Sequence, residues 1–337
     1  MPTAIVPALP ELGPYLPPRV AAALSQVEAT VWSGVEEIRM RVGRPVMLGL
    51  ARGEAWLARS GGICADGDAP LVFTPDDAAL TLDLATRGSV YALQEQLSSG
   101  YLTLPGGHRL GMAGRAVVDG GQLRGLRHPG SFCLRLAREV KGAADRVLPF
   151  LTEGPDCRIS STLLVSPPRC GKTTVLRDAV RQLSDGIPRL RVPPQRVALI
   201  DERSELAGCW QGIPTRDVGL RTDVLDACPK ALGMILALRS MSPDILATDE
   251  IGRAEDVAAI EEAANCGVAV IATAHGWDLA DLRARPTTAE LLARGDFARL
   301  VFLNRVPVPG SVAGVLDGRT MEPIGLPVRR AAGGTAE

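Results

Sequence analysis

The stretch from Leu163 to Thr174 (LLVSPPRCGKTT) constrains the fold of this chain more than any other. A short apolar run ends in a loop, and Gly171-Lys172-Thr173 then opens a segment with helical periodicity. A strand, a glycine-containing loop and a helix in this order are typical of phosphate-binding loops. In such a loop the backbone N–H groups bind phosphate oxygens, the lysine reaches the β- and γ-phosphates, and the first threonine hydroxyl binds Mg²⁺.

The motif predicts that ATP is bound by nine consecutive residues, namely Ser166, Pro167, Pro168, Arg169, Cys170, Gly171, Lys172, Thr173 and Thr174. One of them departs from the pattern G-x-x-x-x-G-K-[ST], and another is unusual for such a loop. Ser166 replaces the first glycine, which is acceptable if its φ is negative. Arg169 is bulkier than the usual residue, so it either projects outward or adds a positive charge near the phosphates. An ordinary capped helix start is the alternative explanation of the motif.

Strand and helix patterns alternate through the carboxy-terminal region, which predicts a parallel sheet covered by helices. The expected strands cover residues 161–165, 197–200, 245–248, 268–273 and 300–304. Ligands of open α/β sheets bind beyond the carboxyl ends of the strands. Polar residues follow four of these strand ends, so we expect their side chains to meet at one edge of the sheet.

The polar residues at these strand ends have the chemistry of ATP hydrolysis. Asp249 is expected to hold Mg²⁺ together with Thr173, and Glu250 to activate the attacking water. Glu202, beside Asp201, is a second candidate for the base, and Glu205 is a further carboxylate of the same segment; a solvated turn is the alternative. His275 is expected to report on the γ-phosphate through a hydrogen bond, although a lone histidine is more often structural.

An arginine that stabilises the transferring phosphoryl group is harder to assign. Arg216, Arg221, Arg239 and Arg253 lie near the motifs in sequence. Such an arginine can come from another subunit. Our preferred pair is Arg221 and Arg239.

The amino-terminal region reads as a small α+β domain. Residues 17–31, 76–84 and 89–97 have helical patterns, and residues 37–50 have the alternation of a strand. Pro105-Gly106-Gly107 and Asp119-Gly120-Gly121 predict hairpins. The numerous arginines of this region are either a solvated face or face a nucleotide or a neighbouring subunit.

Composition limits the partners and the compartment. The net charge is −1 and aromatic residues make up 4% of the chain, so no stable nucleic-acid partner is expected. Seven cysteines without C-x-x-C spacing indicate reduced thiols of a cytoplasmic protein and no zinc site. No apolar run is long enough to span a bilayer, so a partner would have to recruit the protein to a membrane.

Four longer segments resemble the stage III sporulation protein AA family: SPPRCGKTTVLRD, VALIDERSELAGCWQGIPTRDVGLRTDVLDACPK, LRSMSPDILATDEIGR and IATAHG. EEIRMRVGRPVML and SFCLRLAREVKG look like the same family. That family is in turn similar to the ATPases of type II and type IV secretion systems and of type IV pili. The resemblance implies a homo-hexameric ring with active sites between subunits, and an amino-terminal domain that closes over ATP. It also implies a mother-cell ATPase that serves membrane-anchored components of a channel complex between mother cell and forespore.

We therefore predict an α/β protein with a RecA-like P-loop ATPase core at residues 151–305 and a sheet of order 5-1-4-3-2. A smaller α+β domain at residues 1–150 would precede it, and a short hairpin around Asp317-Gly318 with a flexible tail would fill residues 306–337. The predicted activity is Mg²⁺-dependent hydrolysis of ATP that powers or assembles the channel. A nucleic-acid-associated RecA-like ATPase is the alternative, and a small-molecule phosphotransferase is a third reading.

Overall fold

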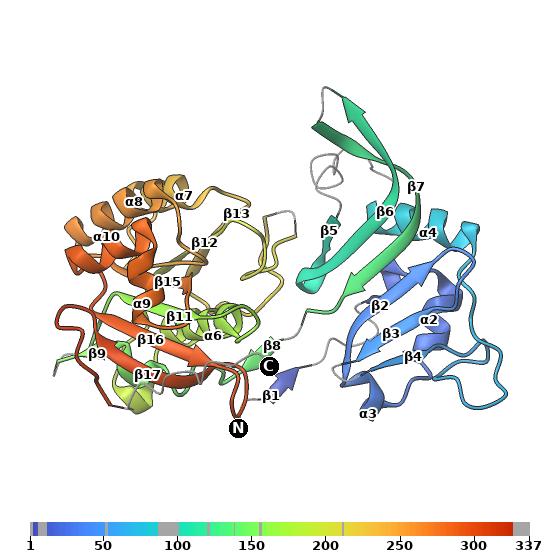
Figure 1. Ribbon diagram of the computed structural model, residues 1–337, viewed down its shortest axis with the longest axis horizontal. Helices are drawn as coiled ribbons and strands as arrows, with labels where there is room; N and C mark the ends of the chain where they lie inside the picture. Colours follow the sequence, from blue (N-terminus) through green and yellow to red (C-terminus); the bar gives the residue numbers. More distant parts are fainter. Residues whose placement is uncertain are drawn as a thin grey trace, which may run out of the picture. The chain divides into compact units, whose positions relative to one another are not determined.

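The computed structural model of the chain (Figure 1) describes residues 3–5, 12–50, 53–86, 101–119, 122–137, 139–154, 157–210 and 212–325. The chain forms two compact units. The amino-terminal unit comprises Ala4–Glu139 together with Gly208–Thr215, and the carboxy-terminal unit comprises Met1–Thr3, Val140–Ala207 and Arg216–Glu337. Short two-stranded sheets pair β1 (Thr3–Ile5) with β8 (Glu139–Lys141) and β9 (Thr152–Glu153) with β10 (Arg158–Ile159).

The amino-terminal unit is built on a six-stranded sheet of order β4-β3-β2-β7-β6-β5, in which all neighbours are antiparallel. Its strands are β2 (Val35–Arg41), β3 (Met47–Leu50), β4 (Glu54–Trp56), β5 (Tyr101–Leu104), β6 (His108–Asp119) and β7 (Gln122–Arg135). Both glycine-rich hairpins are confirmed, because β5 pairs with β6 and Asp119 lies opposite Gln122. The single strand expected over residues 37–50 is wrong, because the chain turns back between β2 and β3.

Helices cover the apolar face of this sheet, where alternate strand residues such as Ile38 and Met40 are fully buried. They are α2 (Pro18–Leu24), α3 (Ala29–Trp32) and α4 (Pro75–Thr86). The helix expected over residues 17–31 is thus interrupted, and the one expected over 76–84 is confirmed. The helix expected over 89–97 lies outside the described residues.

The carboxy-terminal unit is built on a seven-stranded sheet of order β13-β12-β14-β15-β11-β16-β17. The strands are β11 (Thr162–Ser166), β12 (Val197–Asp201), β13 (Thr222–Asp226), β14 (Ile245–Thr248), β15 (Ala269–His275), β16 (Arg299–Asn304) and β17 (Ser311–Asp317). The order predicted for five strands is confirmed, since they follow one another as β16-β11-β15-β14-β12. The sheet has two strands more than predicted: the parallel strand β13 at one edge and the antiparallel strand β17 at the other.

The helices of this unit pack on both faces of the sheet. Alternate strand residues, among them Leu163, Val165 and Leu246, form one apolar cluster with α7 (Lys230–Ser240), α8 (Ala254–Asn265), α9 (Leu279–Ala284) and α10 (Pro286–Arg294). The buried side chains of α6 (Lys172–Asp185) cover the other face. Short 3₁₀ turns complete the chain at Gly13–Tyr15, Pro105–Gly107, Leu148–Phe150 and Pro188–Leu190. No helix in the described ranges is long and apolar enough to cross a membrane.

Candidate functional site

Parallel pairing brings the polar strand ends of the carboxy-terminal unit to one edge of the sheet. Ser166, the last residue of β11, is in register with His275, the last residue of β15. Thr248, the last residue of β14, is in register with Ile200, next to Asp201 at the end of β12. The expected meeting of these four strand ends is confirmed. They surround a cavity of about 320 Å³ that Lys172, Thr173, Asp249, Glu250 and His275 line together.

The predicted phosphate loop, residues 166–174, turns from β11 into α6 through two left-handed residues. Arg169 has φ +60° and Gly171 has φ +84°, whereas Ser166 is not among the residues with positive φ. A Cβ at Gly171 would lie 3.0 Å from Gly310 N, so this position needs glycine both for its φ and for the close approach. The amino terminus of α6 has no side-chain cap, which leaves its first N–H groups for an anion. Arg169 is exposed, as one of the two expectations had it, and it is also among the residues that line the cavity.

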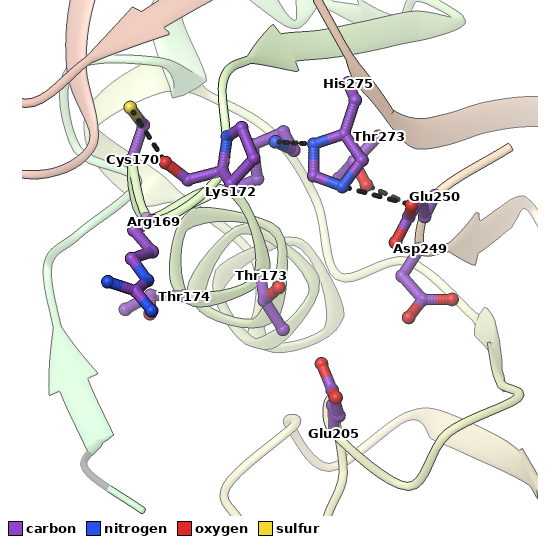
Figure 2. A pocket seen from close by; sticks show the side chains of 12 residues that line it. Arg169, Cys170, Lys172, Thr173, Thr174, Glu205, Asp249, Glu250, Thr273 and His275 are labelled. Atoms are coloured by element: carbon purple, nitrogen blue, oxygen red, sulfur yellow. Dashed lines mark hydrogen bonds and ion pairs between the residues drawn. The ribbon is translucent and has the colours of Figure 1, made fainter.

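The amine of Lys172 lies at the centre of a buried hydrogen-bond network. Its Nζ donates to Ser166 O at 2.6 Å and to Pro167 O at 3.2 Å, and it lies 3.0 Å from His275 Nδ1. Burial lowers the pKa of Lys172, opposed by the charges of Cys170 and Glu250. An ammonium group can only donate hydrogen bonds. His275 Nδ1 therefore accepts the hydrogen bond from Lys172, and the ring proton is on Nε2. Figure 2 shows the lysine directed at the imidazole.

Glu250 is held at the other side of the same imidazole. His275 Nε2 donates to Glu250 Oε1 at 3.0 Å, and Arg203 Nη1 lies 3.3 Å from Glu250 Oε2. The backbone of Glu250 has φ +28°, which is strained for a residue with a side chain. Its N–H donates to Thr273 Oγ1 at 2.8 Å, which fixes this conformation. The carboxylate retains 36% side-chain exposure, so water can reach it.

Asp249 is buried, and its Oδ1 has no hydrogen-bond partner. Burial raises its pKa to about 6; Lys230 opposes this effect, while Asp201 and Glu205 add to it. An orphaned carboxylate oxygen favours a cation, and the hydroxyl of Thr173 and the carboxylate of Glu205 line the same cavity. Mg²⁺ is usually bound by one or two carboxylate or hydroxyl oxygens of the protein together with phosphate oxygens of the ligand, and the donors present here fit that pattern. In the described part of the chain, no three His, Cys, Asp or Glu side chains form a metal cage of their own.

Asp201 organises the loop that carries Glu205. Its fully buried carboxylate accepts hydrogen bonds of 2.8–2.9 Å from three consecutive N–H groups, those of Glu205, Leu206 and Ala207. Arg177 of α6 donates to the carbonyls of Glu205 and Leu206. Asp201 therefore folds the loop, and Glu205 is the residue of this segment that reaches the cavity.

Three of the five predicted catalytic residues lie outside this cavity, and Ser166 and Pro167 of the predicted phosphate loop are not part of its lining either. The carboxylate of Glu202 forms ion pairs with Lys230 and, at 3.6 Å, with Arg253 in a neighbouring cavity. Although burial opposes ionisation, the hydrogen bond and charge of Lys230 keep the pKa of Glu202 below its ordinary value. Arg221 precedes β13, and Arg239 lies in the last turn of α7, just before β14. Both residues therefore lie at the amino-terminal ends of the strands, on the side of the sheet opposite the cavity. Both side chains are exposed.

Two contributors were not identified from sequence. Thr273 supplies the acceptor for the Glu250 N–H, and Arg203 pairs with the Glu250 carboxylate. A threonine two residues before a strand end, inside an otherwise apolar run, was the available signal for the first. For Arg203 the sequence offers no such signal, because its contact with Glu250 joins residues 47 positions apart.

Solved structures show the class to which this fold belongs. The ATPase DotB of Legionella pneumophila matches with a TM-score of 0.53 and 17% identity, over 84% of this chain and 77% of that one. The pilus retraction motor PilT with bound ADP matches with a TM-score of 0.50 and 15% identity, over 80% of this chain and 74% of that one. The chain therefore has the fold of secretion and pilus ATPases; at these identities the likeness shows the fold alone.

Sequence similarity is more specific. The family described as "Sporulation stage III, protein AA" matches residues 19–322. Stage III sporulation protein AA of Bacillus subtilis (strain 168) is 42% identical over 308 residues, covering 91% of this chain and 94% of that protein. The chain belongs to the stage III sporulation protein AA family, as its motifs indicated. The uncharacterized protein ycf45 of Porphyra purpurea is 33% identical over 160 residues, which is 47% of this chain and 26% of that protein.

Proposed function

We propose that this protein is a Mg²⁺-dependent ATPase with a RecA-like P-loop core that powers or assembles a membrane-spanning channel complex during sporulation. One observation carries the enzymatic part. Lys172, Thr173, Asp249, Glu250 and His275 come from three strand ends and line one cavity beside an uncapped helix amino terminus. This combination supplies phosphate donors, a metal ligand and a base within one space.

The roles follow from the groups present. The N–H groups at the start of α6 and the amine of Lys172 would bind the phosphates of ATP. Thr173 and Asp249 would hold Mg²⁺, with Glu205 positioned to hold a metal-bound water. The bound metal would neutralise charge on the phosphates during the reaction. To reach a phosphate, Lys172 would exchange its contacts with Ser166 O and Pro167 O for the ligand.

Glu250 is the proposed base. It would take a proton from water while the water oxygen attacks the γ-phosphorus and the bond to the bridging oxygen breaks, leaving ADP with that electron pair. The proton would then pass to the phosphate product. His275 contacts both the phosphate lysine and the base, so it would couple the position of Lys172 to that of Glu250.

Family membership supports the setting. We infer that the protein works in the mother-cell cytoplasm, recruited by membrane-anchored components, and that it assembles as a homo-hexamer. Arg221 and Arg239 lie at the sheet edge opposite their own cavity, so either one could serve only the site of a neighbouring subunit. A nucleic-acid-associated ATPase remains the alternative, which a net charge of −1 disfavours.

Two variants and one control test the activity. Lys172→Ala is expected to abolish ATP binding in equilibrium titrations. Glu250→Gln is expected to retain binding but to reduce turnover by about a thousandfold. Glu255→Gln, an exposed glutamate in the first turn of α8, is the matched control and should behave as wild type. Wild-type turnover by Glu250→Gln would exclude Glu250 as the base.

Assembly is tested separately by measuring ATPase activity against protein concentration together with the mass in solution. Activity that rises with formation of a six-subunit species supports the ring. Stimulation of hydrolysis by single-stranded DNA or RNA would favour the nucleic-acid alternative instead.

A further inference from the structure

A second cavity, of about 370 Å³, lies beside the nucleotide site and shares a wall with it. The side chains of Glu250 and His275 line both cavities. They are 36% and 34% exposed. A route between the two spaces would therefore pass these two side chains.

The second cavity is cationic. Four positively charged side chains line it against two carboxylates, which leaves a net charge of +2 with His275 neutral: Arg203, Lys230, Arg253 and Arg285 against Glu202 and Glu250. Glu202 is most closely engaged by the buried Lys230, while Arg253 lies 3.6 Å from it and is 69% exposed. The excess positive charge thus resides on the arginines, and Asp281, which is paired with Arg285 but is not part of the lining, reduces it to +1.

Arg285 joins this cavity to the shared wall. Its Nη1 donates to His275 O at 2.8 Å, and its Nη2 lies 3.0 Å from Asp281 Oδ2. It also immediately precedes α10, which begins at Pro286 without a side-chain cap. Thr287 and Thr288 of that first turn line the cavity, so the positive end of α10 adds to the field of the arginines.

We propose that this second cavity, defined by Arg203, Arg253 and Arg285 behind the Glu250–His275 wall, binds the inorganic phosphate produced by hydrolysis and is its exit route. The proposal rests on the proposed ATPase activity, which would release phosphate next to Glu250. Phosphate dianion carries the charge that the cavity lacks, and arginine is well suited to bind its oxygens. Leaving through this wall would let phosphate depart while ADP still occupies the predicted phosphate loop.

The test uses the full-length protein with saturating Mg²⁺–ADP, and inorganic phosphate as the probe. Binding is followed by ³¹P NMR, and phosphate inhibition of steady-state hydrolysis is measured in parallel. Arg253→Ala is expected to weaken phosphate binding and inhibition by about tenfold, the loss of one charge-assisted contact, and Arg285→Glu by more than about tenfold, because it also places a negative charge in the cavity. ADP affinity should not change, which also shows that the variants are folded. Arg283→Glu, an exposed arginine of α9 outside the cavity, is the matched control.

A rapid-mixing experiment then separates cleavage from release. In wild type, phosphate detected by a fluorescent reporter should follow cleavage closely; in Arg285→Glu the cleavage burst should persist while release lags. Equal phosphate affinity in wild type and both variants would overturn the proposal. So would a change in oligomeric mass without a change in phosphate affinity, because the cavity would then serve a carboxylate of another subunit. If wild type binds phosphate but hydrolyses no ATP, the proposed activity fails while the anion site stands.

Discussion

Thr273 Oγ1 accepts a hydrogen bond from the backbone N–H of Glu250 at 2.8 Å, and this bond holds the strained backbone of the proposed base in place. Thr273→Val keeps the shape of the side chain but leaves the N–H without its partner, at a cost of about 1–3 kcal/mol. We expect kcat to fall by about tenfold to a hundredfold because the carboxylate shifts. The KM for ATP should change little. Thr273→Ser, which restores the hydroxyl, is the control, and equal kcat values for the two variants would contradict this role.

The pKa of Asp249, raised by burial to about 6, makes stability depend on pH. The ordinary aspartate pKa lies near 4, so between pH 4 and pH 6 the folded protein binds more protons at this site than the unfolded chain. The free energy of unfolding should therefore fall as pH rises through this window, by up to about 3 kcal/mol. Asp249→Asn removes the titration. Denaturant unfolding in the presence of a chelator should show that the free energy of unfolding falls less between about pH 4 and pH 6 for this variant than for wild type. Identical pH profiles of stability for the two proteins would be evidence against the raised pKa.

Arg169 adopts φ +60°, where a side chain costs free energy that glycine avoids. Arg169→Gly is expected to be more stable to denaturant than Arg169→Ala by about 1 kcal/mol, because both lack the guanidinium and differ only in backbone freedom. If ATP uses the positive charge, both variants should also bind it more weakly. A more stable alanine variant would mean that the left-handed conformation is not adopted in solution.

Asp201→Asn tests whether this carboxylate is structural. Asparagine offers one acceptor oxygen to a buried site where two oxygens accept three N–H groups. We expect a loss of about 2–3 kcal/mol in the free energy of unfolding. Mg²⁺ dependence of nucleotide binding should weaken as well, because Glu205 loses its support. Asp223→Asn, an exposed aspartate on β13, is the control, and an equal stability change in both would argue against the role.

The order of the central strands could be predicted because buried parallel strands are continuous apolar runs, as Ile245–Thr248 shows. The edge strands were missed for the opposite reason. β13 (TDVLD) is only half-buried and carries two aspartates, so it lacks the apolar signal. For β17, the sequence indicates the turn after Asp317 and the strand β16 itself, but not the antiparallel pairing of β17 with β16.

Within the candidate site, the sequence predicts those residues that belong to a motif or follow a strand end, such as Lys172 and Asp249, and both line the cavity. It names Glu202 as the second candidate for the base, whereas Glu205 is the carboxylate of this segment that lines the cavity. Both follow β12, and what separates them is the loop that the Asp201 carboxylate folds around three N–H groups. Side-chain direction after a strand end depends on such tertiary contacts, which have no local periodicity to reveal them.

The turn between β16 and β17 packs against the predicted phosphate loop, although the two segments are far apart in the sequence. Gly310 N donates to Cys170 O at 2.8 Å, and Gly310 packs so closely on α6 that a Cβ there would lie 2.8 Å from Val175 Cγ2. Because a chain folds during synthesis from its amino terminus, the loop stays without this contact until residue 310 has left the ribosome. A nascent chain is therefore expected to gain the proposed nucleotide affinity only after residue 310 has left the ribosome, and a chain shortened after Asn304 should never gain it in full.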